Sequence, residues 1–203
     1  MSESNLPVSE PSHWRRYRTL YLLLAVCVAP VIASYTAYYL LPPGGRTNYG
    51  ALIEPQRPLP ELNLRQLDGS AVPSASLHGS WTMVQVDAGA CDATCEKKLW
   101  KMRQVRLTAG RDADRVRRLW LIVDEAPLAT MLMREYDGTL FLRALPDEVA
   151  RYLPVADDPS ATLADHIWLI DPLGNLMMRW PKDADPNRMK KDLGKLLKAS
   201  GIG

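Results

Sequence analysis

An uninterrupted apolar stretch is the first feature in the pattern of hydrophobic and polar positions. Residues 19–41 read TLYLLLAVCVAPVIASYTAYYLL and contain no charged side chain. A helix needs about 20 mostly apolar residues to cross a bilayer. The apolar part of a cleaved signal peptide is shorter, at roughly 7–15 residues. We therefore expect a retained transmembrane helix over residues 19–41, kinked at Pro30, which membrane helices tolerate.

The charges on either side of this stretch predict its orientation. Arg15, Arg16 and Arg18 precede it, whereas Arg46 is the basic residue that follows closely. Basic residues beside a membrane helix stay preferentially in the cytoplasm. Residues 1–18 are therefore expected to form a cytoplasmic N-terminal tail. The chain after residue 41 is expected in the periplasm, anchored to the cell inner membrane by a single pass.

Residues 42–60 differ from the rest of the chain in their content of proline and glycine. The residues in question are Pro42, Pro43, Gly44, Gly45, Pro55, Pro58 and Pro60. Pro-rich segments are extended and semi-rigid, with a length of about 3.1 Å per residue. We expect residues 42–60 to be a linker that carries one domain, residues 61–203.

Short apolar runs alternate with helical periodicities along this domain. Strands are expected at 62–67, 82–86, 118–123, 140–145, 167–170 and 176–180, and helices at 92–108, 127–136, 146–152 and 185–199. The run RLWLIV at 118–123 is almost continuously apolar, as is typical of a strand covered on both faces. Strand–helix alternation that ends in a hairpin and a last helix predicts an α/β fold. The expected architecture is a mixed sheet covered by helices on both faces.

Composition excludes some functions and draws attention to the cysteines. The chain has 25 basic and 23 acidic residues, so the balance of charge does not indicate a nucleic acid partner. Of its three cysteines, Cys27 lies inside the expected transmembrane helix, where we expect an inert thiol. The preceding residues LAV faintly resemble a lipoprotein cleavage site, and whether Cys27 is lipidated stays open. Cys91 and Cys95 are the thiols of the exported part.

Cys91 and Cys95 follow the expected strand 82–86 and stand at the start of the expected helix 92–108. The N-terminus of a helix stabilises negative charge and so favours a thiolate. Residues four apart lie on one helix face with Cα atoms about 6 Å apart, which allows a disulfide. The same spacing lets two thiolates bind one soft metal ion such as Cu(I). The pair is thus a structural disulfide, a redox dithiol or part of a metal site.

The exported part contains two histidines that could complete a metal site, because two thiolates alone do not fill one. His78 is expected to be a solvent-facing turn residue. His166 lies at the mouth of the expected strand 167–170 and is the candidate third ligand. The alternative is a hydrogen-bonded histidine that caps the hairpin, with Asp165 as its partner.

Two segments carry a resemblance to a known family. The sequence LHGSWTMVQV at 77–86, followed by the cysteine helix, resembles a thioredoxin-like domain. The three-residue gap between the cysteines, with Asp165 and His166 before WLIDPLG at 168–174, is similar to the Sco/SenC family of cytochrome oxidase copper-assembly proteins. The chain is identified as a divergent member. Asp92 and Glu96 stand where this family usually has proline, and their charge is expected to favour the capture of a cation.

The resemblance implies a thioredoxin-like domain over residues 61–203 that binds copper, as Cu⁺ or Cu²⁺, through Cys91, Cys95 and His166. It implies a membrane-anchored copper chaperone for assembly of respiratory cytochrome c oxidase. The implied partners are the oxidase subunit that carries a copper site and the lipid bilayer. The alternative is a membrane-anchored thiol–disulfide reductase, in which Cys91 and Cys95 form the redox dithiol and His166 is not needed. A third possibility is a scaffold that the two cysteines only staple.

Overall fold

The computed structural model describes residues 13–40, 48–155 and 160–203 of the chain, which divides into two compact units, Met1–Thr47 and Asn48–Gly203. The first unit contains one helix, α1 (His13–Leu40), with Pro30 inside it. Its segment Tyr17–Leu40 is, by length and composition, apolar enough to cross a membrane. The N-terminal helix expected from the sequence is confirmed. Residues 1–12 of the expected tail lie outside the described part.

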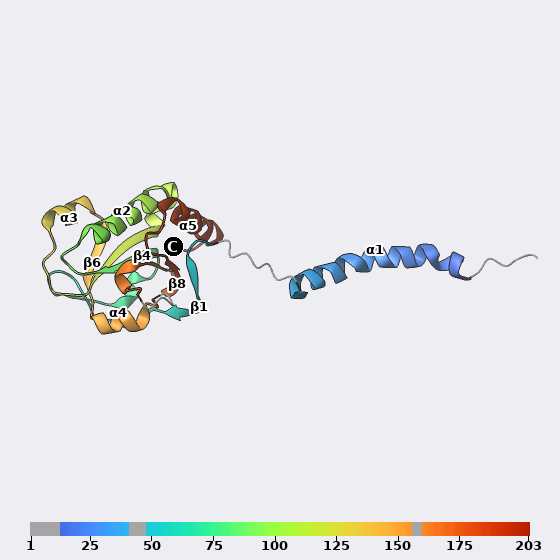
Figure 1. Ribbon diagram of the computed structural model, residues 1–203, viewed down its shortest axis with the longest axis horizontal. Helices are drawn as coiled ribbons and strands as arrows, with labels where there is room; N and C mark the ends of the chain where they lie inside the picture. Colours follow the sequence, from blue (N-terminus) through green and yellow to red (C-terminus); the bar gives the residue numbers. More distant parts are fainter. Residues whose placement is uncertain (1–12, 41–47, 156–159) are drawn as a thin grey trace, which may run out of the picture. The chain divides into compact units, whose positions relative to one another are not determined.

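The second unit is built on one mixed sheet of eight strands in the order β1-β8-β7-β4-β5-β6-β2-β3 (Figure 1). The strands are β1 (Ala51–Pro58), β2 (Leu64–Arg65), β3 (Ala71–Val72), β4 (Trp81–Asp87), β5 (Val116–Ile122), β6 (Thr139–Arg143), β7 (Ile167–Ile170) and β8 (Asn175–Trp180). The central strand β4 pairs in parallel with β5 and antiparallel with β7. The mixed sheet predicted from the sequence is therefore confirmed.

Helices cover both faces of this sheet, with α2 and α5 on one side and α4 on the other (Figure 1). The α-helices are α2 (Ala93–Leu107), α3 (Thr130–Glu135), α4 (Pro146–Tyr152) and α5 (Pro186–Ala199), and short 3₁₀ helices lie at Ser74–Leu77, Gly110–Arg115 and Leu163–Asp165. Helix α2 buries Cys95, Leu99, Met102 and Val105, a stripe at helical spacing. This stripe is what fixes α2, and hence the cysteine pair, against the sheet.

Alternation along the strands separates the core into two halves. Met83 of β4 packs with Cys95 in the half covered by α2 and α5. Its neighbour Val84 belongs to the half covered by α4. In β7, Ile167 belongs to the first half and Trp168 to the second. Side chains of odd and even number in these two strands therefore face opposite helices, as the period of two along a strand requires.

The range 42–60 is not a linker throughout, because β1 (Ala51–Pro58) lies within it. This strand pairs antiparallel with β8, from Ala51 opposite Arg179 to Pro58 opposite Asn175, with an irregularity in the register between Leu52 and Arg57. It forms one edge of the sheet, where proline is tolerated because one side of the strand needs no partner. The prediction of a linker was therefore wrong over residues 51–58.

The start of the domain is held by a buried carboxylate on α5. Asp192, which is 2% exposed, accepts hydrogen bonds from the backbone N–H groups of Tyr49 and Gly50. The indole Nε1–H of Trp180 donates to the same carboxylate at 3.2 Å. Gly50 is packed so closely that a Cβ there would lie 2.5 Å from the sulfur of Met178. These contacts fix the point at which the chain enters the domain.

Candidate functional site

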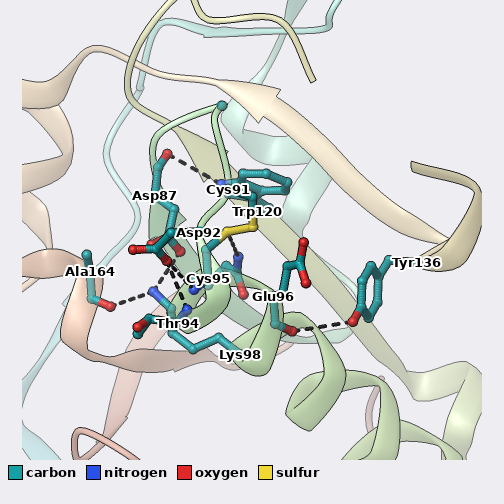
Figure 2. Close-up of a disulfide and its surroundings, with 12 residues drawn as sticks. Asp87, Cys91, Asp92, Thr94, Cys95, Glu96, Lys98, Trp120, Tyr136 and Ala164 are labelled. Carbon is teal, nitrogen blue, oxygen red and sulfur yellow. Dashed lines mark hydrogen bonds and ion pairs between the residues drawn. A yellow bond between two sulfur atoms is a disulfide. The ribbon is translucent and has the colours of Figure 1, made fainter. Parts of the chain in front are cut away.

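Cys91 and Cys95 form a disulfide at the start of α2, with their Cα atoms 5.3 Å apart (Figure 2). Cys91 ends the loop that follows β4 and is half-buried. Cys95 lies in the first turn of α2 and is 1% exposed. The two cysteines therefore differ in exposure: Cys91 is partly open to solvent, whereas Cys95 is enclosed by the core.

Asp92 is the N-cap of α2. Its Oδ1 accepts hydrogen bonds from the backbone N–H groups of Thr94 and Cys95, each at 2.9 Å (Figure 2). Such a cap satisfies donors that have no partner inside the helix. Asp92 thus has a structural role, because it caps the helix that carries Cys95. The sequence predicted that its charge would favour the capture of a cation and did not indicate this role. Glu96 is exposed, and its carbonyl accepts a hydrogen bond from the Tyr136 hydroxyl at 3.4 Å.

The loop between β4 and Cys91 packs tightly against the loop that follows β5. The backbone N–H of Gly89 donates to Asp124 Oδ1 at 2.8 Å. A Cβ on Gly89 would lie 2.5 Å from the carbonyl oxygen of Ala126, so a larger residue would push the two loops apart. This contact fixes the approach of the chain to Cys91.

A buried ion pair lies beside the disulfide. The Nζ of Lys98 on α2 is 2.6 Å from Oδ2 of Asp87, the last residue of β4, and their side chains are 5% and 9% exposed. Lys98 also donates to the carbonyl oxygens of Val86 and Ala164. Its three N–H groups thus have three acceptors. The contact with Ala164, drawn in Figure 2, ties the cysteine helix to the turn that precedes His166.

Burial makes proton exchange at this pair accessible near neutral pH. Desolvation raises the pKa of Asp87 to about 6, although the positive charge of Lys98 opposes the rise. Desolvation also lowers the pKa of Lys98, and the charge of Asp87 opposes that shift. In both groups the loss of water outweighs the attraction of the partner. Asp87 is therefore suited to accept and release a proton next to the cysteine helix.

His166 is a buried imidazole with one occupied and one free nitrogen. The residue is 4% exposed, and its Nδ1 is 3.0 Å from the carbonyl oxygen of Trp180. Because a carbonyl accepts, this contact assigns the proton to Nδ1 and leaves a lone pair on Nε2. Within the described chain Nε2 is buried without a hydrogen-bond partner. Burial lowers the pKa of His166, which favours the neutral ring.

The structure joins Cys91 and Cys95 in the disulfide, whereas the described contacts of the His166 ring are with Trp180 and Trp168. The ring of His166 packs edge-on against Trp168, with centroids 5.7 Å apart, and Trp168 belongs to the half of the core opposite Cys95. Among residues 13–40, 48–155 and 160–203, no group of three or more His, Cys, Asp or Glu side chains is arranged to hold a metal ion. His78 is exposed, as expected.

Asp165 also differs from the partner role expected for it. Its carboxylate accepts from Thr162 and forms an ion pair with Lys182 at 2.8 Å. The hydrogen bond to Lys182, followed by that from the Thr162 backbone, lowers the pKa of Asp165 to about 2. Asp165 therefore stabilises the turn before β7, while the hydrogen bond of His166 is made by Trp180 in β8.

Three residues of the site were not singled out from the sequence: Gln85, Asp87 and Lys98. Gln85 is fully buried in β4 and donates from Nε2 to the sulfur of Cys95 at 3.5 Å. A signal for them exists, because Gln85 and Asp87 are polar residues in an apolar strand and Lys98 lies three residues after Cys95, next to the apolar stripe of α2. Polar groups at core positions need a partner, and this requirement could have marked them.

The sheet, the helices on both faces and the cysteine pair after the central strand together define a thioredoxin-like domain, here preceded by one apolar helix. The chain belongs to the family described as "Transmembrane-like, thioredoxin-like, C-terminal domain", whose sequence model matches residues 81–200. No curated protein sequence matches the chain significantly.

Solved structures with the same fold include Sco proteins. Copper-bound ScoI of Arabidopsis thaliana is 17% identical, with a TM-score of 0.54 over 70% of this chain and 98% of that one. Apo Sco1 of Thermus thermophilus is 16% identical, with a TM-score of 0.56 over 77% and 98%. A thiol:disulfide interchange protein from Bacteroides sp. is 16% identical, with a TM-score of 0.51 over 72% and 91%. The expected resemblance to a divergent Sco protein is thus confirmed for the fold.

Proposed function

We propose that this chain is a membrane-tethered thiol–disulfide exchange protein, with Cys91 as the attacking cysteine and Cys95 as the resolving cysteine. The observation that carries the proposal is the unequal exposure of the two disulfide-bonded cysteines at the start of α2: Cys91 is half-buried and Cys95 is 1% exposed. A structural disulfide needs no such asymmetry and no ionisable pair beside it. Thiol–disulfide exchange needs both, because one sulfur must be reached and protons must be moved.

The reaction can be written for the reduced pair. The Cys91 thiolate attacks a disulfide of the partner, whose S–S bond breaks as a Cys91–partner bond forms. Cys95, having lost its proton, then attacks the Cys91 sulfur and releases the partner's second thiolate, so that two electrons pass to the partner. Asp87, with a pKa of about 6, is the group suited to take the proton. A dithiol donor protein returns the pair to its reduced form.

The proposed setting is the outer face of the cell inner membrane. Arg15, Arg16 and Arg18, which precede the apolar stretch 19–41, favour a cytoplasmic N-terminus and a periplasmic domain. The proposed partner is the cytochrome c oxidase subunit that carries a copper site, in line with the Sco-like fold. A domain tethered to the same membrane as its partner meets it at a raised effective concentration.

Copper transfer is the second candidate function, and the free Nε2 of His166 is the observation that favours it. A neutral imidazole with two thiolates suits copper, which would be cargo here. Cys91 and Cys95 must first be reduced, and the Nε2 of His166 must come within bonding distance of the same copper ion. The fit of the residues to copper is therefore partial: the donor types are right, and the described arrangement holds two of the three together.

Exchange can be tested with the full chain in detergent, carrying Cys27→Ser so that two thiols remain. The reduced protein is mixed with an oxidised peptide that contains one cysteine pair, and products are separated by mass after alkylation. We expect the parent to reduce the peptide, Cys95→Ser to accumulate the mixed disulfide, and Cys91→Ser to do neither. A folded parent whose disulfide resists excess dithiothreitol would rule the proposal out.

Copper binding is tested separately by anaerobic Cu(I) titration of the same reduced chain. Binding at one copper per chain that weakens at least tenfold in His166→Ala, but not in the matched control His78→Ala, supports transfer of copper. A stoichiometry near zero, or binding that survives Cys95→Ala unchanged, removes this second function and leaves the first untouched.

A further inference from the structure

Gln85 is a polar residue enclosed at the centre of the sheet. It is 0% exposed in β4, where it lies opposite Trp120 of β5 and Ile167 of β7. Its Nε2 donates to the Cys95 sulfur at 3.5 Å. Its Oε1 is buried and, in the part of the chain that the structure describes, has no hydrogen-bond partner.

The side-chain amide of Gln85, whose Nε2 has a hydrogen-bond partner and whose Oε1 has none among the described residues, is unfavourable at this position. The next residue on the same face of β4, Met83, is apolar and fully buried, and Trp120 and Ile167 beside Gln85 are apolar as well. Burying an amide oxygen without a partner opposes folding, whereas an apolar residue of the same size would fill the space without that cost. The one described contact that uses the amide is the contact with the sulfur on which the reaction acts.

We propose that Gln85 is a catalytic residue whose amide stabilises the Cys95 sulfur both as a thiolate and as a thiol. This inference rests on the proposed thiol–disulfide exchange. When a thiolate attacks Cys91, the Cys91–Cys95 bond breaks and its electron pair stays on the Cys95 sulfur. The residue Cys95 is 1% exposed, so its side chain is enclosed by the core and water does not solvate the new charge. The Nε2–H of Gln85 is already directed at it and stabilises the thiolate.

The free oxygen of the same amide serves the next state of the cycle. Once Cys95 is protonated, its S–H becomes a donor and needs an acceptor. An amide offers a donor and an acceptor at one position, so a rotation of the Gln85 side-chain amide presents Oε1 to the thiol. The atom without a partner in the disulfide form thus has a partner in the dithiol form, which explains why the amide is retained in an apolar layer.

The test compares Gln85→Met with the parent in the full chain carrying Cys27→Ser, in detergent. Met has nearly the shape of Gln but has no N–H donor. The fraction of reduced pair is measured in dithiothreitol buffers of graded ratio, together with the rate of reduction by dithiothreitol. We expect the equilibrium to move about tenfold toward the disulfide, about 30 mV in potential, and the rate to fall by a similar factor.

Met83→Leu is the matched control, because it changes the same face of the same strand and exchanges one apolar side chain for another, while the hydrogen bond to the Cys95 sulfur is made by Gln85. Gln85→Asn is the second variant, in which a shorter amide loses reach but keeps its polarity; a shift in the same direction is expected. The inference is overturned if both Gln85 variants match the parent within twofold, or if Met83→Leu shifts the equilibrium as far. If dithiothreitol cannot reduce the parent, both the inference and the proposed exchange are overturned. If the parent carries out exchange and the Gln85 variants have the same redox equilibrium and rate, only the inference is overturned.

Discussion

Asp87 shows at the scale of one residue how burial changes chemistry. Its carboxylate lies at the end of a fully buried strand and pairs with Lys98, and desolvation raises its pKa from 3.8 to about 6. Deleting one partner of a buried pair is costly, because the other charge is left without compensation. Asp87 and Lys98 therefore stabilise one another beside the disulfide, where the proposed exchange needs a proton acceptor.

The pH dependence of stability is the prediction at this scale. A carboxyl whose folded pKa is raised binds its proton more tightly when folded, so its contribution to stability is complete below about pH 4 and lost as the pH rises through about 6. For Asp87 the loss amounts to ~3 kcal/mol at most. Urea unfolding at pH 4 to 7 should show this fall in the parent and a flatter profile in Asp87→Asn.

The control for this prediction is Asp114→Asn, since the side chain of Asp114 is 98% exposed. It should keep the slope of the parent. Asp87→Asn leaves Lys98 without its carboxylate and lowers stability at every pH, so the slope, and not the absolute free energy of unfolding, is the quantity compared. A slope in Asp87→Asn equal to that of the parent would show that Asp87 does not titrate in this range.

At the scale of elements, periodicity explains most of what the sequence predicted. A helix was expected over residues 92–108, and α2 buries Cys95, Leu99, Met102 and Val105 at helical spacing. Strand β5 was marked by its continuous apolar run, since β5 is buried on both faces. Strand β1 carried no such signal, because it is an edge strand that contains prolines and leaves much of its surface in solvent. Its order comes from pairing with β8, which is distant in sequence.

The anchoring of this edge by Asp192 gives a prediction for the element. Asp192→Ala leaves the N–H groups of Tyr49, Gly50 and Trp180 without their acceptor, so the free energy of unfolding should fall by about 2–4 kcal/mol. The amides of residues 49–52 should also exchange hydrogen faster, as measured by mass spectrometry. Lys191→Ala, an exposed neighbour on α5, should change stability by less than about 0.5 kcal/mol. Equal effects of the two substitutions would refute the anchoring role.

At the scale of the whole molecule, the chain consists of two units with separate tasks. The helix α1 provides the apolar segment, and Asn48–Gly203 contains both halves of the core and the disulfide. The candidate membrane anchor and the proposed redox site therefore belong to different parts of the chain.

Removal of residues 1–47 tests that separation. The remaining domain should be soluble, with the same urea midpoint and the same equilibrium with dithiothreitol as the full chain in detergent. It should no longer sediment with membranes, and exchange with a membrane-bound partner should slow, because the effective concentration is lost. A truncated domain with an altered redox equilibrium would show that α1 contributes to the site.

The sequence by itself determined the apolar helix, the alternation of strands and helices, and the placement of Cys91 and Cys95 at a helix start. These features follow from local periodicity and spacing, which are properties of neighbouring residues. Only the tertiary structure decided which side of the sheet each distant residue faces. It placed Gln85, Asp87 and Lys98 around the disulfide and turned His166 toward Trp168. The reason is that pairing across the sheet sets the register of each strand, and register and alternation fix the face to which each strand residue points.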